Sequence, residues 1–473
     1  MIKKRNFSSL FCLTIVLLLE ALSSQTKPNL IFIMADDLGY GDLGCYGQKL
    51  IKTPRLDQMA KEGMKFTRFY SGSTVCAPSR SVLMTGQHMG HTHVRGNAGG
   101  DMSRQSLRDI DLTVAEKLKE TGYKTALIGK WGLGEVGQEG HPLKQGFDYF
   151  YGYLNQVHAH NFYPEFLWRN QKKHVLKNVV KPVSDKPRAG FMGGAATKRV
   201  EYSHDLFTAE ALTWIKANKE NPFFLYLPLT IPHANNEGTR MFGDGAEVPD
   251  YGIYEKENWS KQDKGQAAMI TRMDRDVGRL LDLLKELKIE ENTLVMFTSD
   301  NGPHNEAGHN PELFKPAGPL RGMKRTLTEG GIRVPTLAWW PNTIEPNSIS
   351  DQPFYFGVLR APACDMSQSD TPLQTDSLSF LPILKGKAEE QKRHKYLYWE
   401  FYERTFRQAV VMENWKLIRA DMDNQRLELY DLKNDIHEDS NLIQEQPAVA
   451  QRMLSYMESA HVPHPNWTTP KRK

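Results

Sequence analysis

The 473-residue sequence has little cysteine, little net charge and no long hydrophobic segment after its N-terminus. Its four cysteines are too few for a fold held together by disulfides. A formal net charge of +4, with no long run of Lys and Arg beyond the N-terminus, argues against a protein dedicated to binding nucleic acid. Internal repeats and low-complexity segments are also absent. We therefore expect a globular protein with one large α/β domain and one smaller unit.

The first 24 residues have the pattern of a secretory signal peptide. Basic residues at 3–5 precede an apolar run at 10–19, and small residues follow at 21–24. The apolar run is too short to span a bilayer. We therefore expect an exported protein, periplasmic or secreted, with no membrane attachment after the signal is removed.

Cys76 lies in the most informative stretch of the chain. Removal of the signal peptide leaves it with Cys45 and Cys364, and whether those two pair stays open. Residues 76–80 read C-A-P-S-R, and Pro78 suits the first turn of a helix. The stretch therefore predicts a loop that delivers the thiol to a helix N-terminus, where an anion is favoured. The alternative is a small buried thiol in a capping loop.

Oxygen-bearing side chains follow two predicted buried strands. Asp36 and Asp37 come directly after the apolar run at 28–35, and Asp300 and Asn301 follow a second apolar run. Open α/β sheets place their ligand sites at the carboxyl ends of their strands. Carboxylate and amide oxygens suit Ca²⁺ or Mg²⁺. The sequence therefore predicts a cation site, with a solvated turn as the alternative for the adjacent acids.

Three more polar residues follow predicted strands or lie in distinctive motifs. Lys130 begins K-W-G-L-G after a buried strand, where it either is solvated or pairs with an anion. His233 ends T-I-P-H after the apolar run P-F-F-L-Y-L-P-L. Lys324 lies in the motif L-R-G-M-K-R-T-L-T-E-G-G-I-R-V-P.

Histidine-rich segments are candidates for substrate contacts. His91, His93 and Arg95 follow the Cys76 stretch, where loop packing, a solvated loop or a transition-metal site are the alternatives. His160 lies among aromatic and polar residues, a mixture that suits a sugar but also a loop packed over the sheet. His304 follows the predicted cation ligands, and we expect it to face the substrate.

The C-terminal part of the chain predicts a separate small unit. Short strand patterns begin near residue 396, and a helical pattern covers 448–459. The stretch 173–194 is basic and rich in Lys, Pro and Gly, which predicts an exposed insertion, and the stretch 235–260 predicts a long irregular insertion that we expect near the pocket.

These motifs together resemble the type I sulfatases of the alkaline phosphatase superfamily, over nearly the whole mature chain. The resemblance rests on C-x-P-S-R at Cys76, the opening P-N-L-I-F-I-M-A-D-D-L-G, D-N-G at 300–302 and the Lys324 motif. It implies an α/β fold with a large mixed sheet sandwiched by helices and a smaller C-terminal antiparallel sheet plus helix. The implied division is a signal peptide at 1–24, a catalytic domain at 25–387 and a C-terminal subdomain at 388–473.

The resemblance also implies cofactors and roles. A formylglycine-generating maturation enzyme oxidises Cys76 to Cα-formylglycine, whose hydrate is the nucleophile. Ca²⁺ is held by Asp36, Asp37, Asp300 and Asn301, together with the residue at position 76. Arg80 holds the nucleophile and metal ligands, Lys130 and Lys324 contact sulfate, and His233 protonates the leaving group. Gly132 departs from the family pattern G-K-W-H-L-G, and His91 or His93 are candidates to replace the missing histidine.

The implied activity is hydrolysis of sulfate esters. The export signal and the G-K-W-G-L-G variant resemble bacterial carbohydrate sulfatases, so we expect exo-action on a sulfated galactose or N-acetylgalactosamine. Two alternatives stay open. One is a phosphonate or phosphate ester hydrolase of the same superfamily, and the other is a non-catalytic binder of sulfated glycans.

Overall fold

The structure is a computed structural model that describes most of the chain after the predicted signal peptide. Within the described residues, no helix combines the length and the apolar character needed to cross a membrane. The cysteine pairing that the sequence left open is not formed, since Cys45 and Cys364 are both free thiols. The described residues are 27–97, 105–187, 190–367, 375–403, 405–421 and 426–468.

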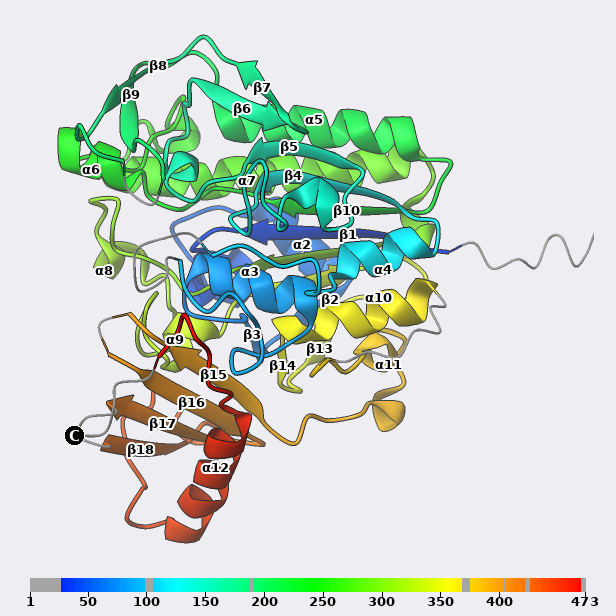
Figure 1. Ribbon diagram of the computed structural model, residues 1–473, viewed down its shortest axis with the longest axis vertical. Coiled ribbons are helices and arrows are strands. Elements are labelled where there is room, and N and C mark those ends of the chain that lie inside the picture. The colour runs from blue at the N-terminus through cyan, green and yellow to red at the C-terminus, as the bar shows by residue number, and fades with distance from the viewer. Residues whose placement is uncertain are drawn as a thin grey trace, which may run out of the picture.

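A ten-stranded mixed sheet forms the centre of the molecule (Figure 1). The predicted fold class, a large mixed sheet between helices with a small antiparallel sheet at the C-terminus, is confirmed. In the large sheet β1 lies between β10 and β11 and is parallel to both. In spatial order the strands are β13 (Ser348–Ser350), β2 (Met64–Phe66), β12 (Thr336–Trp339), β11 (Thr293–Ser299), β1 (Asn29–Ala35), β10 (Phe223–Pro228), β4 (Lys124–Lys130), β5 (Tyr149–Tyr153), β6 (Phe166–Arg169) and β7 (Lys172–Val175).

Helices cover both faces of this sheet, which explains why β1 is apolar at almost every position. Phe32 packs in the core on one face, and Ile33 packs in the core on the other. A strand covered on both faces needs a continuous apolar run instead of alternation. The first face is covered by α3 (Cys76–Thr85), α4 (Val114–Glu120) and α10 (Arg360–Ser367), and the second by α2 (Pro54–Glu62), α5 (Ser203–Asn218) and α7 (Lys261–Glu286).

Helix α3 begins at Cys76 itself, as the C-A-P-S-R motif predicts. Pro78 lies in its first turn, where the missing N–H costs no hydrogen bond. Gly86 ends the helix in the left-handed region, at φ 70°, and its N–H donates to the carbonyl of Val82. The short helix therefore presents residue 76 at its N-terminus with its ten residues all buried.

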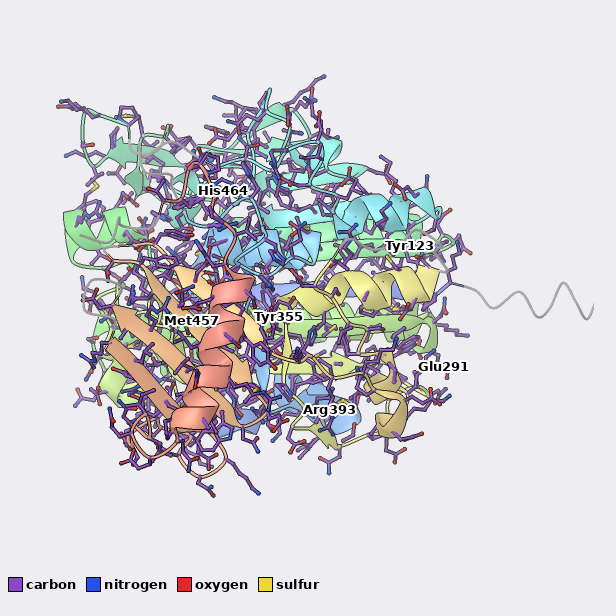
Figure 2. The ribbon with its side chains drawn as sticks, turned by 60° about the horizontal axis from the view of Figure 1, so that its bottom comes forward. Tyr123, Glu291, Tyr355, Arg393, Met457 and His464 are labelled. Carbon is purple, nitrogen blue, oxygen red and sulfur yellow. The ribbon has the colours of Figure 1, made fainter. Side chains whose placement is uncertain are left out.

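A second sheet of four antiparallel strands lies beside the large domain (Figure 1). Helix α12 (Pro447–Ala460) packs on it through Met453 and Met457, the latter visible in Figure 2. Trp399 anchors the small sheet to the large domain, because its indole N–H donates to the carbonyl of Ser71 at 2.9 Å. The predicted boundary at 387/388 stays a prediction. The strands are β15 (Leu397–Phe401), β16 (Arg407–Met412), β17 (Trp415–Asp421) and β18 (Arg426–Asp431).

The stretch 235–260 contains the helix α6, so the prediction that it is irregular was wrong, whereas the described residues of 173–194 are largely exposed, as predicted, and include the strand β8. The strands were missed because they are short and largely exposed, which leaves no apolar period to detect. Residues 64–70 form two short strands, β2 and β3, which belong to different sheets. The remaining elements are β3 (Phe69–Tyr70), β8 (Val179–Pro182), β9 (Gly194–Lys198), β14 (Phe354–Tyr355), α6 (Asn236–Phe242), α8 (Pro311–Phe314), α9 (Glu329–Ile332) and α11 (Leu381–Leu384).

Candidate active site

The carboxyl ends of β1 and β11 bring the predicted cation ligands together. The two strands are parallel neighbours, so the residues that follow them meet at one edge of the sheet. The backbone N–H of Asp37 donates to Oδ1 of Asp300 at 3.1 Å, and Nδ2 of Asn301 donates to Oδ1 of Asp37 at 2.7 Å. Asp36, Asp37, Asp300 and Asn301 are all fully buried.

The N-terminus of α3 adds Cys76 to this group. Its Sγ lies 3.4 Å from Oδ1 of Asp36, and the residue is buried. Burial and the neighbouring Asp36 carboxylate raise the pKa of the Cys76 thiol well above its usual value. An unmodified thiol here stays protonated and is a poor nucleophile.

Two basic residues hold the carboxylates from the side of β4. Arg80 donates from Nε and Nη2 to Oδ2 of Asp300, at 3.2 and 2.7 Å, and from Nη1 to the carbonyl oxygen of Lys130. Lys130 places its Nζ 2.6 Å from Oδ2 of Asp36. Arg80 is fully buried and makes three fixed bonds, so it is suited to positioning its neighbours.

Lys324 and His233 lie on the other side of the acids. Nζ of Lys324 lies 2.6 Å from Oδ2 of Asp37 and 3.1 Å from Nε2 of His233. The Nδ1–H of His233 donates to the carbonyl of Ala234 at 2.7 Å, which leaves Nε2 facing the group. Burial and the Lys324 ammonium lower the pKa of His233 well below its usual range. We call the whole set the Cys76 cluster: Asp36, Asp37, Cys76, Arg80, Lys130, His233, Asp300, Asn301 and Lys324.

The acids of the Cys76 cluster have unequal electrostatic environments. Burial alone would raise the pKa of Asp36, but Lys130 and Arg80 lower it to about 2. Burial and the charge of Asp36 instead raise the pKa of Asp300 to about 7. Arg80, Lys130 and Lys324 balance the three buried carboxylates in formal charge, but the balance is uneven, and Asp300 is the acid whose ionised form is least favoured.

The donor set fits a calcium-type cation. Oδ1 of Asn301 is buried and has no hydrogen-bond partner within the described part of the chain. Ligand atoms of Asp36, Asp37, Cys76 and His233 also lie within 4.8 Å of one another. An orphaned amide oxygen beside converging carboxylates is the chemistry that a hard divalent cation satisfies.

Two of the predicted substrate residues join the Cys76 cluster. The ring of His160 stacks on that of His233, with centroids 5.0 Å apart and planes at 17°. Its Nδ1 pairs with Glu237 at 2.9 Å. The ring of His304 lies 6.0 Å from that of His233, and its Nε2–H donates to the carbonyl of Pro232 at 2.8 Å.

The structure places the other predicted substrate residues against the C-terminal part of the chain. Arg95 pairs with the buried Glu400 of β15 at 2.7 Å. His93 bonds at 2.9 Å to His464, which lies on the segment after α12 (Figure 2). His91 instead bonds to Asp376 at 2.9 Å, and within the described ranges no hydrogen bond or ion pair joins His91, His93 or Arg95 to the Cys76 cluster.

The transition-metal alternative for the histidine-rich segment is disfavoured by its hydrogen bonds. His88, His91 and Asp376 do bring potential ligand atoms within 4.8 Å of one another. Nδ1 of His88, however, accepts the N–H of Gly90 at 3.1 Å. The neutral ring therefore carries its proton on Nε2, which leaves no lone pair there for a metal.

Two residues that sequence reasoning missed support the site. Oδ1 of Asn97 accepts the N–H of Ala77 at 2.9 Å, in the first turn of α3. Glu237 fixes His160, as described above, and belongs to α6. Neither carried a signal of its own, because each acts through a long-range contact.

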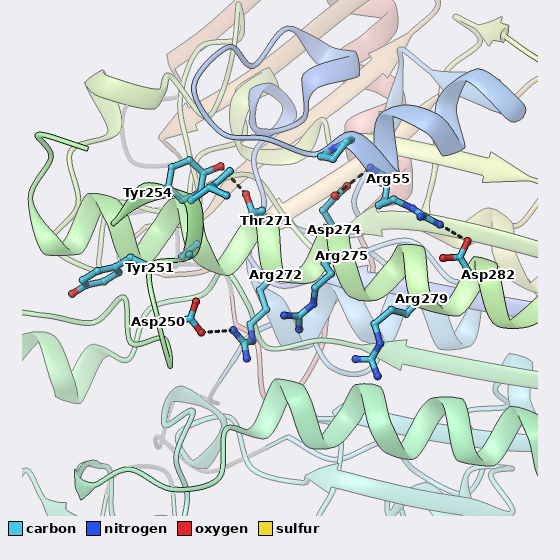
Figure 3. A pocket seen from close by; sticks show the side chains of 14 residues that line it. Arg55, Asp250, Tyr251, Tyr254, Thr271, Arg272, Asp274, Arg275, Arg279 and Asp282 are labelled. Atoms are coloured by element: carbon cyan, nitrogen blue, oxygen red, sulfur yellow. Dashed lines mark hydrogen bonds and ion pairs between the residues drawn. The ribbon is translucent and has the colours of Figure 1, made fainter. Parts of the chain in front are cut away.

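A cavity of about 410 Å³ between α2, α7 and residues 250–254 is separate from the cluster, and its Arg55 and Arg272 are already paired with carboxylates (Figure 3).

Comparison with known proteins identifies the family. The family model described as "Sulfatase" matches residues 28–357. A second model, "N-sulphoglucosamine sulphohydrolase, C-terminal", matches residues 323–461. The first match covers most of the chain and includes every residue of the Cys76 cluster.

Relatives that match most of this chain are named as sulfatases. An N-acetylgalactosamine-6-O-sulfatase of Bacteroides thetaiotaomicron is 29% identical over 92% of this chain and 93% of its own. The N-acetylgalactosamine-6-sulfatase of Canis lupus familiaris is 34% identical over 78% of this chain and 68% of its own. Among solved structures, Ps i-CgsB in complex with k-i-k-neocarrahexaose has a TM-score of 0.76 at 26% identity, over 94% of this chain and 96% of its own. The chain therefore belongs to the sulfatase family and is a sulfuric ester hydrolase.

Proposed function

We propose that the protein removes sulfate from a sulfated sugar of the galactose or N-acetylgalactosamine type, acting on the terminal residue of a glycan. The observation that carries the proposal is the convergence of Cys76 with buried carboxylates, two lysines and His233 at one edge of the sheet. Relatives named as N-acetylgalactosamine-6-sulfatases support this choice of sugar. The neighbour Ps i-CgsB, solved in complex with k-i-k-neocarrahexaose, supports a carbohydrate substrate.

Two groups complete the site. Asp36, Asp37, Asp300 and Asn301 would hold Ca²⁺, which supplies a Lewis acid for the sulfate oxygens and offsets the carboxylate charge. Oxidation of Cys76 to Cα-formylglycine by a separate maturation enzyme supplies an aldehyde whose hydrate has the attacking hydroxyl. The high pKa of the Cys76 thiol supports the need for this modification.

The basic residues stabilise the anionic ester. Lys130 and Lys324 carry buried ammonium groups within reach of the space around Cys76. Each ammonium is bonded to one of the two acids that follow β1. Their charge stabilises the negative charge that develops as the ester bond breaks. Arg80 keeps Asp300 and the end of β4 in place.

His233 is the proton donor for the leaving group. Its Nδ1–H is committed to the carbonyl of Ala234, so only Nε2 can exchange a proton with the substrate. As the bond between sulfur and the sugar oxygen breaks, Nε2 gives its proton to that oxygen and the sugar leaves as an alcohol. Solvent then reprotonates Nε2. The negative charge of the bound ester favours the protonated ring before this step.

The protein works outside the cytoplasm in this proposal. The signal-like pattern at 1–24 lies outside the described residues and supports export to the periplasm or the medium. The partners are then a sulfated saccharide and the maturation enzyme that oxidises Cys76.

The test is sulfate release from a panel of monosulfated sugars, with phosphate esters assayed in parallel. The protein is produced with a formylglycine-generating enzyme, and mass spectrometry measures the aldehyde at position 76. The Cys76→Ala variant is the control for background hydrolysis. We expect release from one sulfated galactose or N-acetylgalactosamine isomer. Faster turnover of phosphate esters, or no release from any sulfate when the aldehyde is present, would overturn the proposal.

A further inference from the structure

The side chain of Gln156 fills the space into which a side chain at position 132 would project. Gly132 has φ 81°, and a Cβ built on it would lie 2.2 Å from Nε2 and 2.8 Å from Cδ of Gln156. The two segments are bonded to each other, because the N–H of Gly132 donates to the carbonyl of Leu154 at 3.1 Å. The glycine therefore makes room for the amide of Gln156 at the end of β4.

This amide is buried and has an unused donor. Gln156 is 6% exposed, and its Nε2 has no hydrogen-bond partner among the residues that the structure describes. The neighbouring Asn155 differs, since its Nδ2 donates to Glu135 and its Oδ1 accepts the N–H of Val157. Buried polar groups are almost always paired, so an unpaired donor next to a functional site points to a ligand.

The position of Gln156 links both sides of the Cys76 cluster. Lys130, which holds Asp36, lies two residues before Gly132 on the same strand end. His160, which stacks on His233, lies four residues after Gln156. Gln156 therefore follows β5 and packs against Gly132, two residues beyond the lysine that holds Asp36.

We propose that Nε2 of Gln156 donates a hydrogen bond to an oxygen of the bound sulfate group and is a substrate-binding residue. This inference rests on the proposed function. Sulfate oxygens only accept hydrogen bonds, so an unpaired amide N–H₂ complements them. The amide adds no charge to a site that already contains Lys130, Lys324 and Arg80, and it gives directional recognition of a tetrahedral oxyanion.

The experiment measures inorganic sulfate binding by calorimetry, and kcat and KM for the sugar sulfate, on the mature calcium-loaded protein. Gln156→Leu removes the donor with little change of volume, and Gln156→Glu replaces it with an acceptor. We expect both variants to lose about ten- to a hundred-fold in sulfate affinity, with a matching rise in KM. Gln58→Glu, the same change on the exposed face of α2, is the control and should match the wild type.

A second variant tests the geometry independently. Gly132→Ala puts a Cβ where the amide lies and should weaken sulfate binding to the same extent. Because both changes act on one contact, Gly132→Ala/Gln156→Leu should lose no more than either single variant. Thermal unfolding of each variant shows whether it folds. If Gly132→Ala does not fold, the result for Gln156→Leu alone decides the test.

The outcomes separate this inference from the proposed function. A wild-type enzyme that hydrolyses no sulfate ester would overturn the function. An active wild type whose Gln156 variants keep sulfate affinity and KM would overturn only the inference. A loss confined to kcat would also overturn it, since the amide would then serve the nucleophile and not the sulfate group.

Discussion

The ammonium group of Lys324 lies 3.1 Å from Nε2 of His233. An ammonium can only donate, so Nε2 accepts this bond and the ring is neutral in the structure. The same Nζ lies 2.6 Å from Asp37, which keeps it charged by ion pairing. In the proposed mechanism, a bound sulfate ester competes for that ammonium, and this competition frees Nε2 to carry the proton for the leaving group.

Replacing Lys324 should therefore affect catalysis more than folding. Lys324→Met keeps the length of the side chain and removes its charge. We expect kcat/KM for the sugar sulfate to fall by about a hundred- to a thousand-fold, the usual effect of losing one buried stabilising donor. Lys216→Met, at an exposed position of α5, is the control. Activity close to wild type in Lys324→Met would contradict the role given to this residue.

The role of His233 can be tested by comparing two esters whose leaving groups differ in their need for a proton. We expect His233→Gln to lower turnover of the sugar sulfate by about a hundred- to ten-thousand-fold, because an alkoxide needs a proton to leave. The leaving group of an aryl sulfate is a stable phenolate, which needs no proton. The fall in turnover caused by His233→Gln should therefore be much smaller for an aryl sulfate. Paired kcat values for the two esters measure the difference. Equal losses on both would show that His233 positions groups and does not donate the proton.

The convergence of the predicted cation ligands could be predicted because it follows from a rule of sheet architecture. Buried strands 28–35 and 293–298 are continuous apolar runs, and acids follow each of them. Parallel packing of β1 against β11 then brings Asp37 and Asp300 within hydrogen-bond distance. Local sequence patterns also gave the positions of β1 and of the C-terminal helix α12.

Contacts between distant parts of the chain were not predictable. Arg95 and Glu400 are 305 positions apart, and nothing near either one indicates the other. The histidine-rich segment was therefore expected near the substrate, although its side chains pack against the C-terminal part of the chain. The pairing of Gly132 with Gln156 has the same origin, since the glycine signals only that some other group occupies its space.

Serine at position 76 should stop the catalytic cycle without emptying the cation site. Where the maturation enzyme leaves the serine of Cys76→Ser unoxidised, which intact-mass spectrometry checks, a sulfated serine has no second hydroxyl with which to expel sulfate. We expect no multiple turnover, with any reaction limited to a stable covalent adduct that intact-mass spectrometry detects. Calcium binding, measured by calorimetry, should persist because the three carboxylates remain. Full multiple turnover by this variant with an unoxidised serine would refute the formylglycine mechanism.

The unpaired oxygen of Asn301 provides a test of the cation site. Asn301→Ala removes that oxygen and the bond from Nδ2 to Asp37. We expect calcium affinity to fall by at least about tenfold. Asn218→Ala, at the end of α5, should bind calcium as the wild type does. A wild-type protein whose melting temperature and activity do not respond to calcium or to a chelator would argue against the assigned ion.

Stability should fall in mild acid because of His88. This residue is 6% exposed and packs with its ring 4.0 Å from that of His91. Burial lowers the pKa of His88 from 6.5 to about 4, although the Asp376 carboxylate opposes the shift. Between these two values the unfolded chain binds a proton that the folded chain does not, so the free energy of unfolding decreases as the pH falls. The contribution is fully present above about pH 6.5 and is lost as the pH falls toward about 4.

The variant His88→Asn isolates this contribution. Asparagine keeps an acceptor near the N–H of Gly90 but does not titrate, so the variant should lack the part of the pH dependence that comes from position 88. The full contribution is on the order of 3 kcal/mol, from 1.36 kcal/mol per pKa unit. Unfolding measured from neutral pH down to about pH 4 should therefore give a flatter profile for His88→Asn than for the wild type. His437→Asn, at an exposed position, is the control. Profiles of the same slope in the wild type and His88→Asn would show that His88 does not set the acid sensitivity, because only a group that titrates differently in the two states can change that slope.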